Sequence, residues 1–318
     1  MAEATASIRA RGVVVRYPGQ TRDAVAGVDL DVEAGRFVVL LGPSGCGKST
    51  LLRTFNRLVE PHAGSIVVDG IDVRSADPVA LRRGIGYVIQ AVGLFPHMSV
   101  AQNIAIVPDL LGWEKGRIAQ RVDELLRLVR LDPQRYRARR PRELSGGEQQ
   151  RVGVARALAA HSHILLMDEP FGAVDAIVRL ALQDETVAIH RALGTTIVFV
   201  THDVDEALRI ADRIVVMREG RIVQDDTPLR ILTHPATPFV AELLDARDVV
   251  RRLGLLRVRD AMGPPNETAS GEIDANASLH EALNLMLEGV ERLNVVKDGA
   301  RAGTLAFNDI RRALGQAS

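Results

Sequence analysis

Hydrophobic residues along the chain fall into two alternating patterns, short apolar runs and longer mixed stretches. The runs are rich in β-branched residues and predict buried strands at 12–17, 36–41, 164–167, 196–200 and 214–217. The mixed stretches have the spacing and length of helices and predict them at 49–58, 146–160 and 175–193. Strands that alternate with helices are typical of an α/β domain with a mainly parallel sheet.

The middle of the chain, from about 99 to 160, has little strand signal. Apolar residues at helical spacing predict one amphipathic helix there, through Ile118, Val122, Leu125, Leu126 and Val129. We therefore expect a helical subdomain, at about 92–160, inserted into the α/β domain.

The pattern changes again after Phe239. A charged helix that follows indicates a linker over 241–256. Beyond it, the apolar runs predict a small β-α-β-β-α unit. We therefore expect two domains, a large one over 1–240 and a small one over 257–318.

The composition excludes several classes of protein. With 318 residues, of which 47% are hydrophobic, the chain is long enough for two domains and too apolar to be disordered. Its 40 basic and 40 acidic residues balance, so we expect neither a nucleic-acid-binding protein nor one held on anionic membranes by charge. A single cysteine, Cys46, permits no internal disulfide. Neither a secretory signal nor an apolar run near ~18 residues is found, so we expect a cytoplasmic protein without a membrane span.

A phosphate-binding loop is indicated by the motif G-x-x-x-x-G-K-S. Its residues are Gly42, Pro43, Ser44, Gly45, Cys46, Gly47, Lys48 and Ser49, with Thr50 following. Glycines let backbone N–H groups turn toward phosphate oxygens, and the predicted helix presents its positive N-terminus. Lys48 would place a compact charge at the β- and γ-phosphates, and Ser49 a hydroxyl at Mg²⁺. Lysine is otherwise found only at 115 and 297, so a lysine at this position supports a role for its compact charge in holding phosphate.

Two later segments narrow the class of nucleotide-binding protein. Ser145, Gly146 and Gly147 stand at the predicted start of a helix, where bare N–H groups and the helix dipole favour an anion. The next predicted strand ends in Asp168 and Glu169. One carboxylate can hold a Mg²⁺-bound water, and the other can activate an attacking water.

With these segments in this order, the chain resembles the ATP-binding-cassette (ABC) ATPases over about residues 8–245. The resemblance implies a P-loop NTPase fold, ATP and Mg²⁺ as ligands, and ATP hydrolysis. It also implies that Tyr17 stacks on adenine, that Leu144–Glu148 is the family signature, and that Asp175 contacts a second chain. Around the phosphates, Asp168 would belong to the magnesium site and Gln90 would contact Mg²⁺ and the attacking water. Glu169 would be the general base, and His202 would contact the γ-phosphate.

The same resemblance implies partners. Two chains would pair head to tail, so that each ATP lies between the P-loop of one chain and the signature of the other, here ending in Glu148. A separate membrane permease would carry the solute while this chain sits at the cytoplasmic face of the membrane, and a substrate-binding protein would act through that permease. The apolar, proline-containing segment 93–100 suits docking on the permease or, equally, packing on the helical subdomain.

Further segments resemble one group within the family. Residues 86–90, 93–97, 151–156 and 197–203 look most like importers of quaternary-ammonium osmoprotectants such as glycine betaine, carnitine and choline. An importer of amino acids, polyamines or other solutes is the alternative, because other subunits select the solute. A soluble cassette ATPase of DNA repair or translation would need coiled coils, a zinc module or a second cassette. An exporter would usually have fused membrane spans, and the sequence has none of these features.

The end of the chain resembles a single CBS motif, through residues 258–262, 278–286 and 293–309. Osmoprotectant-importer ATPases often carry such modules, usually with two motifs. Ala306 stands where nucleotide-binding motifs place Ser or Thr, whereas Asp309, the candidate for a ribose contact, is present. A dimerisation element that pairs across two chains is the alternative to a nucleotide sensor.

Overall fold

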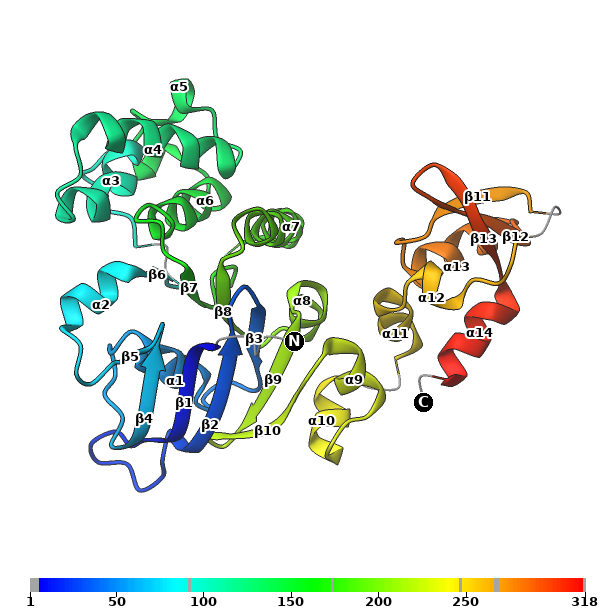
Figure 1. Cartoon of the computed structure of the whole chain (residues 1–318), viewed down its shortest axis with the longest axis horizontal. Helices are drawn as coiled ribbons and strands as arrows, with labels where there is room; N and C mark the ends of the chain where they lie inside the picture. Colours follow the sequence, from blue (N-terminus) through cyan, green and yellow to red (C-terminus); the bar gives the residue numbers. More distant parts are fainter. Residues whose placement is uncertain (1–5, 91–92, 173, 246–247, 266–268, 317–318) are drawn as a thin grey trace. The chain divides into compact units, whose positions relative to one another are not determined.

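The computed structural model describes residues 6–90, 93–172, 174–245, 248–265 and 269–316 (Figure 1). The chain divides into two compact units, Met1–Val223 and Gln224–Ser318. Each unit has its own buried core, and each is described by itself below.

A six-stranded sheet is the centre of the first unit. Its strands are β3 (Phe37–Leu41), β6 (Ile85–Val88), β7 (Ile164–Asp168), β8 (Thr196–Thr201), β9 (Arg213–Arg218) and β10 (Arg221–Asp226). Their order is β10-β9-β3-β8-β7-β6, and the neighbouring pairs from β9 to β6 are parallel. Every residue of β3, β7 and β8 is buried, as expected for a sheet covered on both faces. The predicted α/β class with a mainly parallel sheet is confirmed.

A second, antiparallel sheet packs on the other side of helix α1 (Lys48–Phe55). Its strands are β1 (Ala6–Val15), β2 (Val25–Glu33), β4 (Ala63–Val68) and β5 (Ile71–Asp72), in the order β2-β1-β4-β5. Leu51, Leu52 and Phe55 of α1 are fully buried in one core with side chains from both sheets. Burial of this kind stabilises the fold by about 2 kcal/mol for each large apolar side chain.

The strand predicted at 12–17 is longer than expected and ends earlier. A register shift between Ala10 and Val13 displaces the alternation of buried side chains by one residue. The alternation in the first half of β1 is therefore out of step with that of 12–17, and the sequence pattern did not predict this half. Ile8 and Ala10 are nevertheless fully buried. Because β1 ends at Val15, Tyr17 lies in the turn that follows the strand.

The remaining helices of this part of the unit flank the parallel sheet. They are α2 (Pro78–Gly84), α7 (Ala176–Leu193) and α8 (Val204–Ile210). Helix α7 begins at Asp175, whose carboxylate accepts the N–H of Val178 at 3.0 Å, and ends at Gly194 in the left-handed conformation.

The regular elements described between 93 and 160 are all helical, as predicted. They are α3 (Val100–Leu110), α4 (Lys115–Leu128), α5 (Pro133–Tyr136), the 3₁₀ helix η1 (Pro141–Glu143) and α6 (Gly146–Ala157). The predicted apolar face of α4 is buried, through Ile118, Val122, Leu125 and Leu126. Figure 1 shows these helices gathered together, joined to the sheets through β6 and β7.

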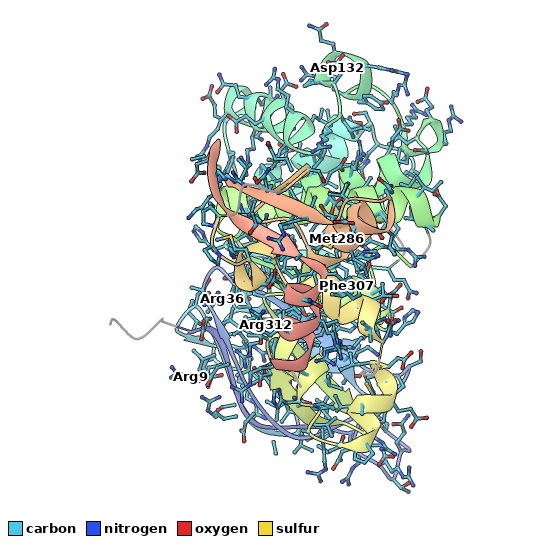
Figure 2. The ribbon with its side chains drawn as sticks, turned by 90° about the vertical axis from the view of Figure 1, so that its right-hand side faces the viewer. Arg9, Arg36, Asp132, Met286, Phe307 and Arg312 are labelled. Atoms are coloured by element: carbon cyan, nitrogen blue, oxygen red, sulfur yellow. The ribbon has the colours of Figure 1, made fainter. Side chains whose placement is uncertain are left out.

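The second unit contains a three-stranded sheet with helices beside it. Its elements are α9 (Pro228–Thr233), α10 (Pro238–Leu243), α11 (Val249–Leu255), α12 (Val258–Ala261), β11 (Gly271–Asp274), α13 (Leu279–Leu287), β12 (Arg292–Lys297), β13 (Ala300–Ala306) and α14 (Phe307–Gln316). Strands β11 and β12 are parallel, and β12 and β13 are antiparallel. From β11 onward the elements follow the predicted β-α-β-β-α order. Figure 2 shows Met286 near the end of α13 and Phe307 at the start of α14, where Phe307 is 56% exposed.

The segment predicted as a linker, 241–256, is part of the second unit instead. Leu253 and Leu256 are buried in its core together with Leu279 and Leu293. The charged side chains of α11 suggested a solvated connection, but one apolar side of this short helix packs inward. The unit therefore begins near Gln224, earlier than the predicted boundary. No helix in the described ranges is long and apolar enough to cross a membrane.

His190 ties together the amino ends of three strands of the parallel sheet. Its Nδ1 donates to the carbonyl oxygen of Thr195 at 2.8 Å, and its Nε2 lies 3.7 Å from Asp212, just before β9. Asp212 also accepts the N–H of Phe37, the first residue of β3, at 2.9 Å. The nearby carboxylate of Asp212 raises the pKa of His190 against the opposing effect of burial, and the same contact lowers the pKa of Asp212.

We predict that this contact stabilises the fold most strongly in mildly acidic solution. Because the pKa of His190 is raised above its ordinary 6.5, the stabilisation is fully present below that pH and is lost as the pH rises through the raised pKa. His190→Gln should lower the free energy of unfolding by about 2 kcal/mol near pH ~6, and by less near pH ~9. Urea unfolding at the two pH values measures this difference. The exposed His163→Gln is the matched control, and equal losses at both pH values would contradict the assignment.

Candidate functional site

The predicted phosphate-binding loop leaves the buried strand β3 and enters α1. Gly47, the N-cap of α1, has φ 105°, and a Cβ there would collide with the carbonyl oxygen of Ala24. A Cβ at Gly42 would collide with the carbonyl oxygen of Met217, on β9. Only glycine therefore allows the loop to pass this close to its two neighbouring segments.

Lys48 holds the loop from inside. Its side chain is buried, and Nζ donates to the carbonyl oxygens of Gly42 at 2.6 Å and Pro43 at 3.0 Å. The ammonium group is thereby fixed beside the N-terminus of α1. A fixed cation next to a helix N-terminus suits a polyphosphate.

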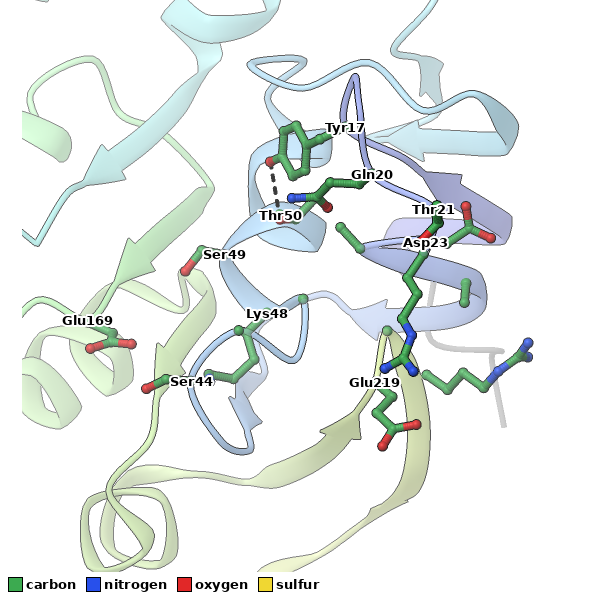
Figure 3. A pocket seen from close by; sticks show the side chains of 17 residues that line it. Tyr17, Gln20, Thr21, Asp23, Ser44, Lys48, Ser49, Thr50, Glu169 and Glu219 are labelled. Carbon is green, nitrogen blue, oxygen red and sulfur yellow. Dashed lines mark hydrogen bonds between the residues drawn. The ribbon is translucent and has the colours of Figure 1, made fainter.

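A cleft of 710 Å³ opens in front of this loop (Figure 3). Tyr17 forms part of its wall, and its hydroxyl oxygen lies 3.2 Å from Oγ1 of Thr50. The predicted site residues that line the cleft are Tyr17, Ser44, Gly45, Gly47, Lys48, Ser49, Thr50 and Glu169. An aromatic wall opposite a phosphate-binding loop, in a cleft of this size, fits a nucleotide.

Three residues of the predicted loop do not line the cleft: Gly42, Pro43 and Cys46. Gly42 and Pro43 act through the carbonyl groups that hold Lys48. The side chain of Cys46 is 5% exposed and belongs to the hydrophobic core, and burial raises the pKa of its thiol. Any contact of Cys46 with a nucleotide must therefore come from its backbone.

Two turns that the sequence did not identify complete the cleft, at 20–26 and 219–221. The first follows Tyr17, so its turn residues and the neighbouring aromatic were a usable signal. The second, between β9 and β10, reaches the loop through a backbone hydrogen bond: the N–H of Gly220 donates to the carbonyl oxygen of Cys46 at 2.9 Å. No local motif marks such a contact.

Asp168 is the buried carboxylate of the site, at the carboxyl end of β7. Its Oδ1 accepts the hydroxyl of Ser49 at 2.6 Å, and its Oδ2 accepts Arg53 at 3.0 Å and the hydroxyl of Tyr87 at 3.5 Å. A hydroxyl beside a carboxylate is the hard oxygen set that Mg²⁺ prefers, so Ser49 and Asp168 fit the predicted metal.

Arg53 and Tyr87 are site residues that sequence reasoning missed. Arg53 lies one helical turn after Ser49, which was an available signal.

Gln90 follows β6 and is exposed. Its side-chain amide lies beside Gly172, and it does not line the cleft. Its predicted contacts with Mg²⁺ and water stay predictions.

Glu169 and His202 meet at the carboxyl ends of β7 and β8. Nδ1 of His202 lies 3.1 Å from Oε2 of Glu169. Glu169 has φ 45°, an uncommon conformation for a residue other than glycine, and its N–H donates to the carbonyl oxygen of Val200 at 3.1 Å. The strained backbone turns this carboxylate toward the cleft, where it forms part of the lining.

The predicted signature forms a separate helix start. Ser145 caps α6: its Oγ accepts the N–H of Glu148 at 3.3 Å, while Glu148 Oε2 accepts the N–H of Ser145 at 2.7 Å. Ser145 and Gly146 are exposed, whereas Gly147 packs on Val178 of α7. Neither these residues nor Asp175 line the P-loop cleft. The structure thus brings Lys48, Ser49, Asp168, Glu169 and His202 together at one edge of the parallel sheet. Gln90, the signature and Asp175 do not line the cleft.

The fold and the site define an ATP-binding cassette. The family model for ABC transporters matches residues 25–172. Among solved structures, the dimeric post-hydrolysis state of the cassette MJ0796, bound to ADP and Pi, is similar with a TM-score of 0.63. Its sequence is 29% identical, and the match covers 70% of this chain and 98% of that one.

Curated relatives extend the likeness beyond the cassette. The glycine betaine/carnitine/choline transport ATP-binding protein OpuCA of Bacillus subtilis (strain 168) is 48% identical over 87% of this chain and 73% of its own length. The glycine betaine uptake system ATP-binding protein YehX of Escherichia coli (strain K12) is 50% identical over 90% of this chain and 94% of its own. The chain therefore belongs to the ABC transporter family, as an ATP-binding, ATP-hydrolysing subunit.

Proposed function

We propose that this chain powers the import of a quaternary-ammonium osmoprotectant such as glycine betaine, carnitine, choline or proline betaine, through a separate membrane permease. The observation that carries the proposal is the extent of the likeness to the betaine-type relatives. Matches over 87% and 90% of the chain must include much of the second unit, as well as the cassette. The chain would lie at the cytoplasmic face of the membrane, and a substrate-binding protein would act through the permease.

ATP hydrolysis would take place at the cleft. Glu169 would accept the proton of the attacking water, and His202 would orient the Glu169 carboxylate and reach the γ-phosphate. When bound, Mg²⁺ would be held by Ser49 and Asp168 and would neutralise charge on the β- and γ-phosphates. Lys48 would bind the same phosphates, with Tyr17 against the adenine.

The signature would complete the site from a second copy of the chain. Ser145 and Gly146 are exposed and do not line the cleft of their own chain. A head-to-tail pair would bring this helix start to the partner's ATP, with the exposed Asp175 at the contact. The solved relative MJ0796 is dimeric, which supports pairing of two chains.

Glu169→Gln should abolish turnover while preserving ATP binding. Loss of a general base typically lowers a rate by about a hundredfold to ten-thousandfold. We therefore expect the variant to hold ATP and to accumulate as an ATP-bound pair in gel filtration. The exposed Glu60→Gln is the control for loss of one acidic charge. Hydrolysis by the Glu169 variant at a rate near that of the wild type would refute the assignment.

A groove on the first unit would receive the permease. Its volume is 330 Å³, and it is lined by Arg82, Arg83, Ile85, Gly86, Tyr87, Gly93, Phe95, Ile106, Val107, Arg156, Ala157, Ala160 and Ser162. Phe95 is 44% exposed, an unusual position for a large aromatic. The groove therefore combines an apolar anchor with arginine side chains.

Asn103 would fix the conformation of the segment 93–100, which contains Phe95 of the groove. This fully buried side chain accepts the N–H of Phe95 at 2.8 Å and donates to the carbonyl oxygens of Phe95, Met98 and Ser99 at 3.0 to 3.3 Å. Asn103→Ala would remove the side-chain partner of the Phe95 N–H and of the Met98 carbonyl oxygen, at a cost of about 2 kcal/mol. We expect permease-stimulated ATP hydrolysis to fall about tenfold and ATP binding by the isolated chain to stay within about twofold. Leu110→Ala, at an exposed position of the same helix, is the control. Equal losses in binding and stimulation would contradict the role.

We also propose that the last part of the second unit, 257–318, is a single CBS-like motif with a structural role. The β-α-β-β-α order of its elements supports the motif. Asp309, the candidate for a ribose contact, instead accepts the N–H of Ala306 at 2.9 Å and pairs with Arg312 at 3.4 Å. Since its carboxylate serves the start of α14, pairing between chains is favoured over nucleotide sensing.

Transport by the assembled complex tests the proposed function. Proteoliposomes containing this chain, its permease and its substrate-binding protein should take up labelled glycine betaine in an ATP-dependent manner. The same preparation with the Glu169→Gln variant should not. ATP-driven uptake of a labelled amino acid or polyamine in place of betaine would assign the chain to another importer class.

A further inference from the structure

A tyrosine outside the known motifs reaches the signature helix. The hydroxyl of Tyr136, at the end of α5, donates to Oε1 of Glu148 at 2.6 Å. Tyr136 is only 9% exposed, so this contact is sheltered by the surrounding helices. The guanidinium carbons of Arg139 and Arg135 lie 4.7 and 5.5 Å from the centroid of its ring. Both guanidinium groups are within the distance of a cation–π contact, which helps to hold the ring in place.

Glu148 needs a hydrogen-bond donor because its carboxylate lies at the start of α6. Oε2 is bound to the N–H of Ser145 at 2.7 Å, and Tyr136 binds Oε1. Both oxygens are therefore directed to donors of the same chain. A carboxylate without these donors would repel an anionic ligand at the start of α6 and would compete for its N–H groups. In agreement with this geometry, the Tyr136 hydroxyl lowers the pKa of Glu148 and the carboxylate raises that of Tyr136.

We propose that Tyr136 is a positioning residue for ATP hydrolysis, which acts through Glu148 to hold Ser145 and the start of α6 ready for the phosphates bound by a second chain. The inference deepens the proposed function and rests on it. Tyr136 touches neither the P-loop nor the cleft lining. Its loss should therefore affect closure of the paired site and leave the first binding of ATP intact.

The test is the variant Tyr136→Phe in the full-length chain, which removes one hydroxyl and keeps the ring. Loss of one hydrogen bond to a charged group should lower kcat about tenfold. The Kd of a fluorescent ATP analogue for the dilute, unpaired chain should stay within about twofold. Gln134→Ala, an exposed position on the same short helix, is the matched control. Equal changes in kcat and in this Kd would overturn the proposal.

A second background separates positioning from general loss of structure. In Glu148→Ala chains the hydroxyl of Tyr136 has no acceptor at position 148, so adding Tyr136→Phe should change kcat by less than about twofold. A tenfold loss in both backgrounds would mean that Tyr136 acts independently of Glu148, and would overturn the proposal.

Hydrogen exchange gives a readout that does not depend on catalysis. In Tyr136→Phe, the peptide that contains Ser145 should exchange faster, while peptides from β3 and β7 should be unchanged. Unchanged exchange at Ser145 would overturn the positioning role even if kcat falls. If the wild-type chain binds ATP without hydrolysing it in any assembly, the proposed function fails, and the exchange measurement still decides whether Tyr136 orders the helix start.

Discussion

The parallel pairing of β8 with β3 on one side and β7 on the other is the constraint on which the nucleotide site depends. Leu41 pairs with Thr201, and Asp168 pairs with Val200, so the three strands end at the same edge. The P-loop, Glu169 and His202 are the segments that follow those ends. A slip of one residue in either pairing would displace the functional groups by about 3.3 Å and break the contact between Ser49 and Asp168.

Sequence reasoning identified the site residues that belong to local sequence motifs. The P-loop, the carboxylates after β7 and the cap of α6 are local patterns, and all lie where strand and helix predictions place them. Tyr87 and the turn at 219–221 escaped notice because each becomes a site residue only through contacts with distant segments. Arg53 was missed although its position one helical turn after Ser49 was a usable signal. The first half of β1 and the helix α11 were misjudged for another reason. A bulge and a cluster of arginines masked the apolar positions that pack inward.

Three acidic groups of the predicted site are held by partners from other segments. Arg53 binds Asp168, His202 lies against Glu169, and Tyr136 binds Glu148. These contacts fix the carboxylates before any ligand arrives, so the site reorganises little when charge develops.

Tyr87 gives the first unit a mechanical property that neither cavity has alone. Its ring is part of the wall of the groove that contains Phe95, while its hydroxyl lies 3.5 Å from the carboxylate that also binds Ser49. One side chain therefore spans the distance between an outer surface and the carboxyl end of β7. Because the ring is rigid, a displacement of the groove wall at Tyr87 would also move the hydroxyl that lies beside Asp168.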